Sequence, residues 1–371
     1  MAGCLKGIYT GTQMKILFME PYPTEGPSSR YRVEQYIPYF RDKGIKCIVR
    51  PFMSSGFYKI IYKKGFYLQK ILFLLESSFK RFSDIFIALR SDIIFIHLEA
   101  FPFGPPLFEW IIYLSGKKII YDLDDAIYMG ITSPANRFLI KLKCPNKIKE
   151  IIRISNYVIT CNSYLADYAR RYNKNVVVMH TAVDTEKFTP SLKDDEHNIT
   201  IGWIGSHSTA YYLECLRDVF SSISNKYGFT LKIIGARNLN IKIDGVKIIN
   251  LEWTLKDDIK QFQSLDIGVY PLPENEWIRG KTGFKTIQYM SVGIPSVVSD
   301  VGANRNIVQD GINGYLARTK YEWVQKLSRL IEDRELRRKM GLAGRKTVEQ
   351  NFSMRVNAPK YLNIFMKCME K

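Results

Sequence analysis

The sequence predicts two α/β domains, each built on a parallel sheet that is covered by helices. The length of 371 residues suits two domains that each bury their own core. Continuous apolar segments of strand length alternate with longer helical patterns, which is typical of parallel sheets buried on both faces. This alternation is interrupted by the polar segment 189–198 and then starts again, which indicates a linker between two similar halves.

In the N-terminal half, the first strand begins at Met14. We expect strands at 14–20, 45–52, 91–98, 117–125, 156–163 and 176–183. Helices are expected at 31–43, where Gly44 follows, and near 107–115. Residues 1–13 fit no signal-peptide pattern, and we interpret them as a leader outside the fold.

The C-terminal half repeats the same alternation of elements. Its expected strands are 199–206, 229–236, 246–253, 266–272, 295–300 and 314–318. Its expected helices are 210–227, 255–264, 282–292, 304–309, 320–332 and 334–350. The predicted domains are therefore 14–188 and 199–352, joined by the linker 189–198 and followed by a helical tail at 353–371.

Composition limits the class of protein. The six cysteines form no Cys-x-x-Cys pair or Cys/His cluster, so neither a zinc site nor a disulfide framework is expected, and a cytoplasmic location is the default. No apolar run reaches the ~20 residues that span a bilayer. The net charge of +18 fits a nucleic acid or an anionic membrane, but no nucleic-acid-binding signature is present, so we expect no nucleic-acid partner.

Residues 57–82 interleave basic with apolar and aromatic side chains. Their apolar residues recur at nearly helical spacing, as in a basic amphipathic helix lying on an anionic leaflet at the inner face of a membrane. A core-packed helix with a basic outer face fits the same pattern equally well.

Two turns in the C-terminal half suit a phosphate group. The first follows the strand 199–206 and contains Gly205, Ser206, His207 and Ser208 ahead of a helix, whose free amides could bind an anion. An ordinary capped turn is the alternative. In the second, Arg279, Lys281 and Lys285 flank Gly283 at a helix start, with Gln288 one turn later. A basic surface loop is the alternative there.

Carboxylates and cations gather at predicted strand ends of the N-terminal half. Asp122, Asp124 and Asp125 could orient a hydroxyl, accept a proton or bind a metal, or they could simply cap a helix. Other polar residues expected on the same rim are Arg30, Arg32, His97 and Glu99.

The segments M-S-V-G-I-P-S-V-V and D-G-I-N-G-Y-L, within 277–317, resemble the donor-binding motif of the retaining glycosyltransferases of family 4, the group 1 glycosyltransferases. The segment HTAVDTEKFTP, 180–190, is similar to the family's linker entrance. The resemblance implies a GT-B fold, in which two Rossmann-like domains face each other across a cleft and a C-terminal helix crosses back. The family's paired glutamates would fall on Gly280 and Gln288, as in a subset that carries Arg-Gly-Lys-x-x-Phe-Lys-x-x-Gln.

This resemblance implies a retaining hexosyltransferase in bacterial surface-polysaccharide synthesis. It would use a nucleoside diphosphate sugar, a glycan or lipid-linked acceptor, and no metal or other cofactor. Lys285 and Arg279 would be catalytic with Asp122 and Asp124, while Arg30, Arg32, Glu99 and Asp125 would face the acceptor. The expected donor-binding residues are Gly205, Ser206, His207, Ser208, Glu252, Trp253, Lys281, Gly283, Phe284 and Gln288. A nucleotide-sugar 2-epimerase of the same fold, or a non-catalytic sugar-nucleotide or nucleic-acid binding protein, remains an alternative.

Overall fold

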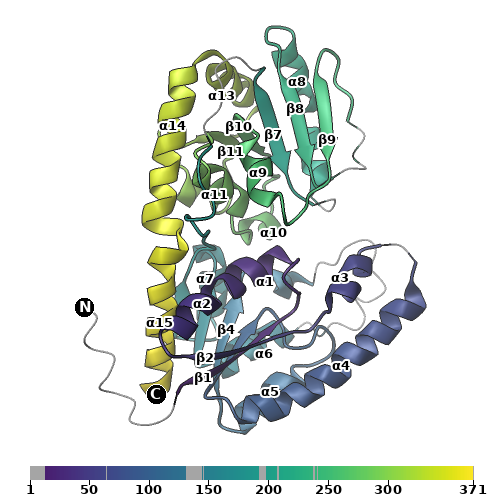
Figure 1. The fold of residues 1–371 in the computed structure, drawn as a ribbon, viewed down its shortest axis with the longest axis vertical. Helices are drawn as coiled ribbons and strands as arrows, with labels where there is room; N and C mark the ends of the chain where they lie inside the picture. The colour runs from purple at the N-terminus through teal and green to yellow at the C-terminus, as the bar shows by residue number, and fades with distance from the viewer. Residues whose placement is uncertain are drawn as a thin grey trace. The chain divides into compact units, whose positions relative to one another are not determined.

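The computed structural model describes residues 13–63, 65–130, 144, 146–191, 198–206, 209–236, 239 and 241–370. The chain divides into two compact units (Figure 1): unit 1 is Met1–His180 with Ala358–Lys371, and unit 2 is Thr181–Asn357. Within the described residues, each unit holds one six-stranded sheet in which neighbouring strands pair in parallel. The predicted class, two α/β units on parallel sheets, is therefore confirmed. The boundary between the units falls at 180/181, and most of the predicted linker lies outside the described residues.

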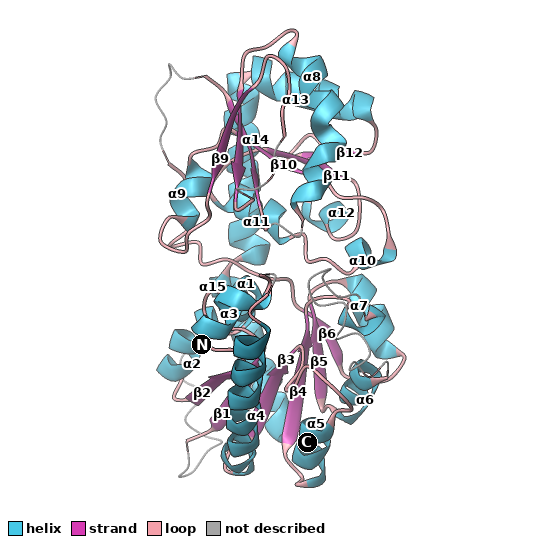
Figure 2. Cartoon of the chain, turned by 90° about the vertical axis from the view of Figure 1, so that its right-hand side faces the viewer, coloured by secondary structure: helices cyan, strands magenta, loops and turns pink. Residues whose placement is uncertain are grey.

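The sheet of unit 1 has the strand order β2-β1-β3-β4-β5-β6. Its strands are β1 (Lys15–Glu20), β2 (Lys46–Pro51), β3 (Ile93–His97), β4 (Lys118–Leu123), β5 (Tyr157–Thr160) and β6 (Val176–Val178). Each lies inside a predicted strand segment. The central strands β1, β3 and β4 are buried almost throughout, because helices lie on both sides of the sheet (Figure 2).

The helices of unit 1 differ from the expected ones in two places. They are α1 (Pro27–Arg32), α2 (Ile37–Asp42), α3 (Ser55–Ile61), α4 (Tyr67–Leu89), α5 (Leu107–Leu114), α6 (Lys147–Ile154) and α7 (Ser163–Arg170). The helix expected at 31–43 is wrong, since Val33 has non-helical angles, φ −125° and ψ −67°, and separates α1 from a 3₁₀ turn and α2. The basic stretch 57–82 is shared between two helices, α3 and α4.

Unit 2 has the strand order β12-β11-β10-β7-β8-β9. Its strands are β7 (Thr200–Ile204), β8 (Thr230–Ile234), β9 (Lys247–Leu251), β10 (Ile267–Tyr270), β11 (Ser296–Ser299) and β12 (Tyr315–Ala317). Its helices are α8 (Arg217–Ser224), α9 (Asp258–Gln263), α10 (Glu276–Arg279), α11 (Phe284–Ser291), α12 (Asn304–Ile307), α13 (Lys320–Glu332) and α14 (Arg334–Thr347). The helix expected at 210–227 begins instead as the 3₁₀ segment Ala210–Leu216.

Helix α11 packs closely on the sheet of unit 2 because β10 carries a glycine beneath it. A Cβ atom at Gly268 would lie 2.6 Å from the ring of Tyr289, so only glycine leaves room for that ring. The Tyr289 hydroxyl lies 3.3 Å from the Gly202 and Val269 carbonyl oxygens, which ties α11 to β7 and β10. This contact fixes the position of the residues at the start of α11.

The last helix, α15 (Met354–Glu370), contributes its residues from Ala358 onward to unit 1. Tyr361 and Phe365 pack against the aromatic rings of Phe18, Phe40 and Phe95 from the N-terminal part of the chain. The core of unit 1 is therefore built from both ends of the sequence. Among the described residues, no helix is both long and apolar enough to cross a lipid bilayer.

Candidate functional site

In unit 2 the predicted donor residues gather at the carboxyl ends of the strands, where the strand order reverses. Strand β7 lies between β8 and β10, so its carboxyl end is the switch point at which open α/β sheets bind ligands. Gly205 follows β7, Gly235 follows β8 and Tyr270 ends β10. The sheet thus brings together residues that are far apart in the sequence.

Two glycines at this edge leave the backbone without side chains, and neighbouring atoms pack tightly against both. A Cβ atom at Gly205 would lie 2.4 Å from Cζ2 of Trp203 and 3.0 Å from Cε of Lys285. Gly235 has φ +88°, and a Cβ atom there would lie 2.0 Å from the carbonyl oxygen of Gly205. Both positions therefore require glycine. Sequence reasoning missed Gly235, although a glycine that ends a predicted strand was the available signal.

Lys285 lies in the first turn of α11, beside this bare backbone. Its Nζ atom is 4.9 Å from the centre of the Tyr270 ring and 5.5 Å from that of Trp203. Burial, together with the nearby charge of Lys281, lowers the pKa of Lys285 to about 8. Lys285 forms no ion pair with a carboxylate among the residues that the structure describes. A partly buried cation without a counter-charge is suited to binding an anion.

Gly283 begins α11 in the left-handed region, with φ +66°. A Cβ atom there would lie 2.6 Å from Cδ1 of Ile307, so both the backbone angle and the space require glycine. The Thr282 hydroxyl accepts a hydrogen bond from the Phe284 amide at 3.2 Å. The predicted glycine start of this helix is present, and it places the first turn of α11 and Lys285 at the strand ends.

The two other predicted cations already have neighbours in unit 2. Arg279, half-exposed at the end of α10, forms an ion pair with Glu274 at 3.3 Å. Lys281 lies over the Trp277 ring at 4.8 Å. Gln288 is buried on α11, about one turn beyond Lys285. Lys285 is thus the cation that the structure holds against the glycine backbone.

The remaining predicted donor residues are spread around the same edge. Trp253 follows β9 and is held by its indole, which donates a hydrogen bond to Asp258 at 2.8 Å. Glu252 is exposed, and Phe284 is half-buried as the first residue of α11. The Ser206 carbonyl accepts hydrogen bonds from the amides of the turn that follows it. His207 and Ser208 lie outside the described residues.

In unit 1 the carboxyl edge carries a buried network centred on Asp122. Arg32 Nε donates a hydrogen bond to Asp122 at 3.0 Å, and its NH2 group makes a second contact to the same carboxylate. His97 Nδ1 lies 2.7 Å from Asp122 Oδ2, and it donates because a carboxylate only accepts. Burial alone raises the pKa of Asp122, but the charge of Arg32 and the hydrogen bonds outweigh burial and hold that pKa below its ordinary value.

The network continues outward through Ser28. The Ser28 hydroxyl lies 2.5 Å from His97 Nε2 and donates to Asp124 Oδ2 at 2.9 Å. Immediately after His97 the chain turns at Leu98, which has φ +61°, a costly angle for leucine that is found mainly at functional sites. The predicted pair of carboxylates therefore divides into two roles: Asp122 is fully buried and orients His97, whereas Asp124 lies at the end nearer the solvent.

Three predicted acceptor-side residues have partners outside this network. Arg30 donates to the carbonyl oxygen of Thr24 at 2.9 Å, and Glu99 forms an ion pair with Lys147 at 3.2 Å. Asp125 accepts a hydrogen bond from the Ala126 amide at 3.0 Å. The sequence placed His97 on this rim but gave no sign that His97 and Ser28 join Asp122 and Asp124.

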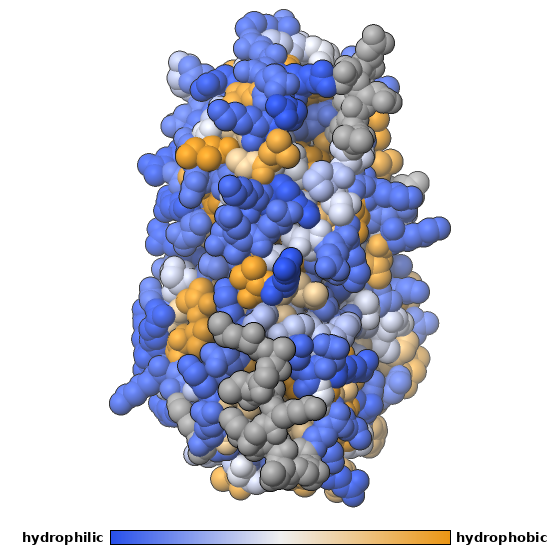
Figure 3. All heavy atoms as spheres, turned by 60° about the vertical axis from the view of Figure 1, so that its left-hand side comes forward, coloured by the Kyte–Doolittle hydropathy of each residue, from blue (hydrophilic) through white to orange (hydrophobic). Residues whose placement is uncertain are grey.

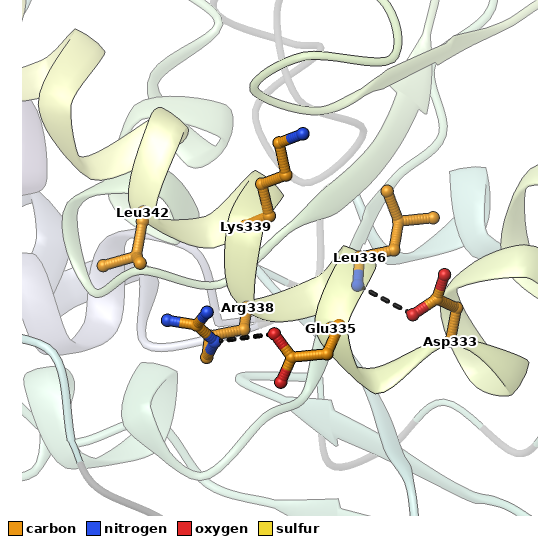
Figure 4. A pocket seen from close by; sticks show the side chains of 6 residues that line it. All are labelled: Asp333, Glu335, Leu336, Arg338, Lys339 and Leu342. Atoms are coloured by element: carbon orange, nitrogen blue, oxygen red, sulfur yellow. Dashed lines mark hydrogen bonds and ion pairs between the residues drawn. The ribbon is translucent and has the colours of Figure 1, made fainter.

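A separate hollow lies on α14 and is lined by Asp333, Glu335, Leu336, Arg338, Lys339 and Leu342 (Figure 4). Glu335 and Arg338 form an ion pair across it at 3.1 Å. It shares no residue with the predicted site, and Asp333 within it caps α14 by accepting a hydrogen bond from the Leu336 amide at 2.8 Å.

Comparison with known proteins supports the interpretation of the fold. Residues 198–333 match the family model described as glycosyl transferases group 1. No curated protein shows significant sequence similarity to the chain. The structure is similar to a glycosyltransferase from Rickettsia africae, with a TM-score of 0.70 and 15% identity over 97% of this chain and 100% of the other.

Two further solved structures show the same arrangement of elements. HepE from Anabaena in complex with UDP-glucose has a TM-score of 0.67 and 16% identity over 95% of this chain and 100% of its own. Sucrose-phosphate synthase from Thermosynechococcus elongatus has a TM-score of 0.64 and 14% identity over 96% of this chain and 99% of its own. The chain thus has the GT-B fold of solved glycosyltransferases, and residues 198–333 match the group 1 glycosyltransferase model.

Proposed function

We propose that the protein is a retaining hexosyltransferase of family 4 that transfers a sugar from a nucleoside diphosphate sugar to an acceptor hydroxyl. It would belong to the subset with Arg279, Lys281, Lys285 and Gln288 in place of the paired glutamates. The observation that carries the proposal is Lys285, a cation without a carboxylate partner among the described residues, held beside the bare backbone of Gly205. The match of residues 198–333 to the group 1 model supports it.

The chemistry that this site favours is stabilisation of a leaving diphosphate. The bond from the sugar to the diphosphate breaks, and negative charge grows on the departing oxygens in the transition state. Lys285, held beside Gly205 at the carboxyl end of β7, would receive that charge and so lower the barrier without rearrangement. Gln288 would contact a ribose or sugar hydroxyl, and Trp253 with Glu252 would contact the base.

In the proposed reaction the acceptor attacks from the face that the diphosphate leaves, and the diphosphate takes up the acceptor proton. Asp122 is committed to Arg32 and His97, which suits it to positioning rather than to proton transfer. Asp124, at the outer end of the network, would orient the acceptor hydroxyl through its carboxylate. No metal is required in this scheme, so excess chelator should leave turnover unchanged.

The proposed acceptor is a growing surface glycan, free or lipid-linked. The basic stretch 57–82 supports the lipid-linked form, because its lysines suit the phosphate groups of an anionic leaflet at the inner face of a membrane.

A thermal-shift panel of UDP-, GDP-, ADP- and TDP-sugars tests the donor, with UDP-glucose first because HepE binds it. The expected result is stabilisation by one base class, lost in Lys285→Ala and kept in Lys320→Ala, whose exposed side chain pairs with Asp218. Nuclear magnetic resonance of the product then reports whether the anomeric configuration is retained. Release of a 2-epimerised sugar from donor alone would identify an epimerase, and binding without turnover would identify a non-catalytic protein.

A further inference from the structure

Between Ser77 and Ala88, helix α4 is attached to unit 1 through a mainly polar side, whereas Phe73 and Leu74 nearer its start pack against an apolar cluster that includes residues of α3. The residues that it buries are Ser77, Arg81, Asp84 and Ala88, which lie three or four residues apart and so on one side of the helix. Arg81 and Asp84 form a fully buried ion pair at 3.1 Å, and Arg50 Nε lies 2.5 Å from the same carboxylate. Arg81 also donates to the carbonyl oxygens of Glu20 and Arg50. Polar contacts therefore hold this part of the helix against the sheet.

The opposite side of α4 is apolar and exposed. Seven large apolar residues follow each other at alternating intervals of four and three, which places them in one continuous stripe. They are Leu68, Leu72, Leu75, Phe79, Phe82, Phe86 and Leu89, with exposed fractions from 42% to 75%. A helix on a water-facing surface normally has the reverse arrangement, with its apolar stripe buried. In Figure 2 α4 runs in front of the sheet, and among the described residues no helix or strand lies between it and the viewer.

Helix α5 extends the apolar surface beyond α4. The Phe82 ring on α4 lies 5.0 Å from the Phe108 ring on α5, so the two helices are in contact. Four of the five large exposed residues of α5 again share one side, namely Leu107, Trp110, Ile111 and Leu114, the last 80% exposed, whereas Tyr113 lies on another side. We call the α4 stripe and these four residues the apolar face. By contrast, the face seen in Figure 3 is mainly hydrophilic, with small separate apolar groups.

The charged groups on the segments that form or flank the apolar face in the sequence are mostly cations. Exposed or half-exposed cations within residues 55–63, 65–90 and 107–118 are Lys59, Lys63, Lys70, Lys80, Arg90, Lys117 and Lys118. The acids in the same ranges are Asp84 and Glu109, which are buried, and Glu76, which is exposed. An apolar surface carried by segments whose exposed charges are mostly positive matches an anionic lipid leaflet, whose headgroups carry phosphate above an apolar interior.

We propose that the apolar face of α4 and α5 docks the protein on an anionic membrane, with both helices lying in the plane of the headgroups. The alternative occupant, a second copy of the chain, fits the side chains less well. Parallel two-stranded coiled coils favour β-branched residues at alternate positions of such a stripe, whereas α4 has Leu72, Phe79 and Phe86 there. The face also extends onto a second helix, which a single seam between two helices would leave uncovered.

Membrane docking does not depend on the chemistry proposed for Lys285, so the two proposals fail separately. If both hold, docking would bring unit 1, with its Ser28–His97–Asp122–Asp124 network, to the leaflet that carries lipid-linked acceptors. A docked chain could then find its acceptor by diffusion in two dimensions rather than three.

Co-sedimentation of the full chain with vesicles tests the proposal. The vesicles are phosphatidylcholine alone and phosphatidylcholine with phosphatidylglycerol, each at low and at high salt. Binding is expected on the anionic vesicles, and high salt should weaken it because the cations are screened. The triple variant Leu72→Ser, Phe79→Ser, Phe86→Ser should bind more than about tenfold more weakly, since buried apolar area supplies much of interfacial affinity.

The matched control is Tyr321→Ser with Leu342→Ser, because both side chains are large, exposed and located in unit 2. It should bind vesicles like the unmodified chain, and circular dichroism should show that all variants are folded. Equal binding by the triple variant, or no binding to anionic vesicles, would overturn the proposal. A stable dimer in analytical ultracentrifugation that the triple variant dissociates, without vesicle binding, would assign the face to a second copy.

Discussion

The two units place charged residues at equivalent edges of their sheets but differ in whether the cation there has a carboxylate partner. In unit 1, Arg32 is fully buried and its charge is matched by Asp122, which in turn holds His97. In unit 2, Lys285 lies over two aromatic rings and has no carboxylate partner among the described residues. A matched charge fixes geometry, whereas an unmatched one is available to a ligand. The comparison predicts that the charges of unit 1 position groups, whereas Lys285 of unit 2 is available to an anionic ligand.

The largest effect, on the free energy of unfolding, is expected when the buried Arg32–Asp122 ion pair of unit 1 is broken. Arg32→Met leaves the Asp122 carboxylate buried without its guanidinium, and loss of one partner of a buried pair costs about 3–5 kcal/mol. Urea denaturation followed by circular dichroism measures this loss. Arg30→Met, which removes a partly exposed side chain bonded to a backbone carbonyl, should cost under about 1 kcal/mol. Similar losses in both variants would mean that the Arg32–Asp122 pair is not what stabilises this edge.

The second effect concerns the unmatched charge of unit 2. Lys285→Ala should lower kcat by about 10²–10³, because it would remove the cation that we propose stabilises the leaving diphosphate. Steady-state kinetics with the donor identified by thermal shift measures this change, and the control variant Lys320→Ala should keep full activity. If kcat is unchanged in Lys285→Ala, the charge of Lys285 is not part of the catalytic machinery.

A smaller effect tests the backbone that carries Lys285. Gly283→Ala introduces a side chain at φ +66° and against Ile307, which should destabilise unit 2 by about 1–3 kcal/mol. Gly228→Ala is the matched control, since a Cβ atom there meets nothing within 4 Å. Tryptophan fluorescence is a suitable probe, because Trp203, Trp253, Trp277 and Trp323 all lie in unit 2. If the two glycine variants unfold alike, the start of α11 is less constrained than the structure implies.

The smallest expected effect is a dependence of ligand affinity on pH that comes from the charge of Lys285. The pKa of Lys285 is lowered to about 8, so its charge is present below that pH and lost as the pH rises through it. Affinity for a nucleoside diphosphate should therefore fall above about pH 8, by at most about tenfold per pH unit. Isothermal titration calorimetry measures this fall in affinity. A range of about pH 6.5 to 9.5 brackets the pKa by roughly 1.5 units on each side. Lys285→Ala should give a flat profile, and an equally steep one would assign the titration to another group.

Most of the fold could be predicted because its strands are continuous apolar segments, which few other structures explain. The start of α11 was also predictable, since Gly283 with cations around it is a local pattern. Gly235, Trp203 and Tyr270 were not, because parallel pairing of strands that are far apart in the sequence brings them to Gly205 and Lys285.

The network of unit 1 depends on contacts that no local pattern contains. Ser28 and His97 are 69 residues apart, and His97 and Asp122 are 25 apart. Their meeting requires the register of β3 against β4, which pairs His97 with Asp122, and the placement of α1 beside them. Periodicity also predicted that α4 has an apolar side, but it cannot tell an inward side from an outward one. Exposure of that side became known only from the folded chain.

Unit 1 is built from two separate parts of the chain, and this determines which unit can complete its fold first during synthesis. Its core needs Tyr361 and Phe365, which reach Phe18, Phe40 and Phe95 only after the whole of unit 2 has been made. Once residue 357 has been translated, unit 2 is complete, but unit 1 still lacks the part of its core that begins at Ala358. The N-terminal unit is therefore the last to be completed, and a chain terminated before residue 358 would leave those three phenylalanines without their covering helix.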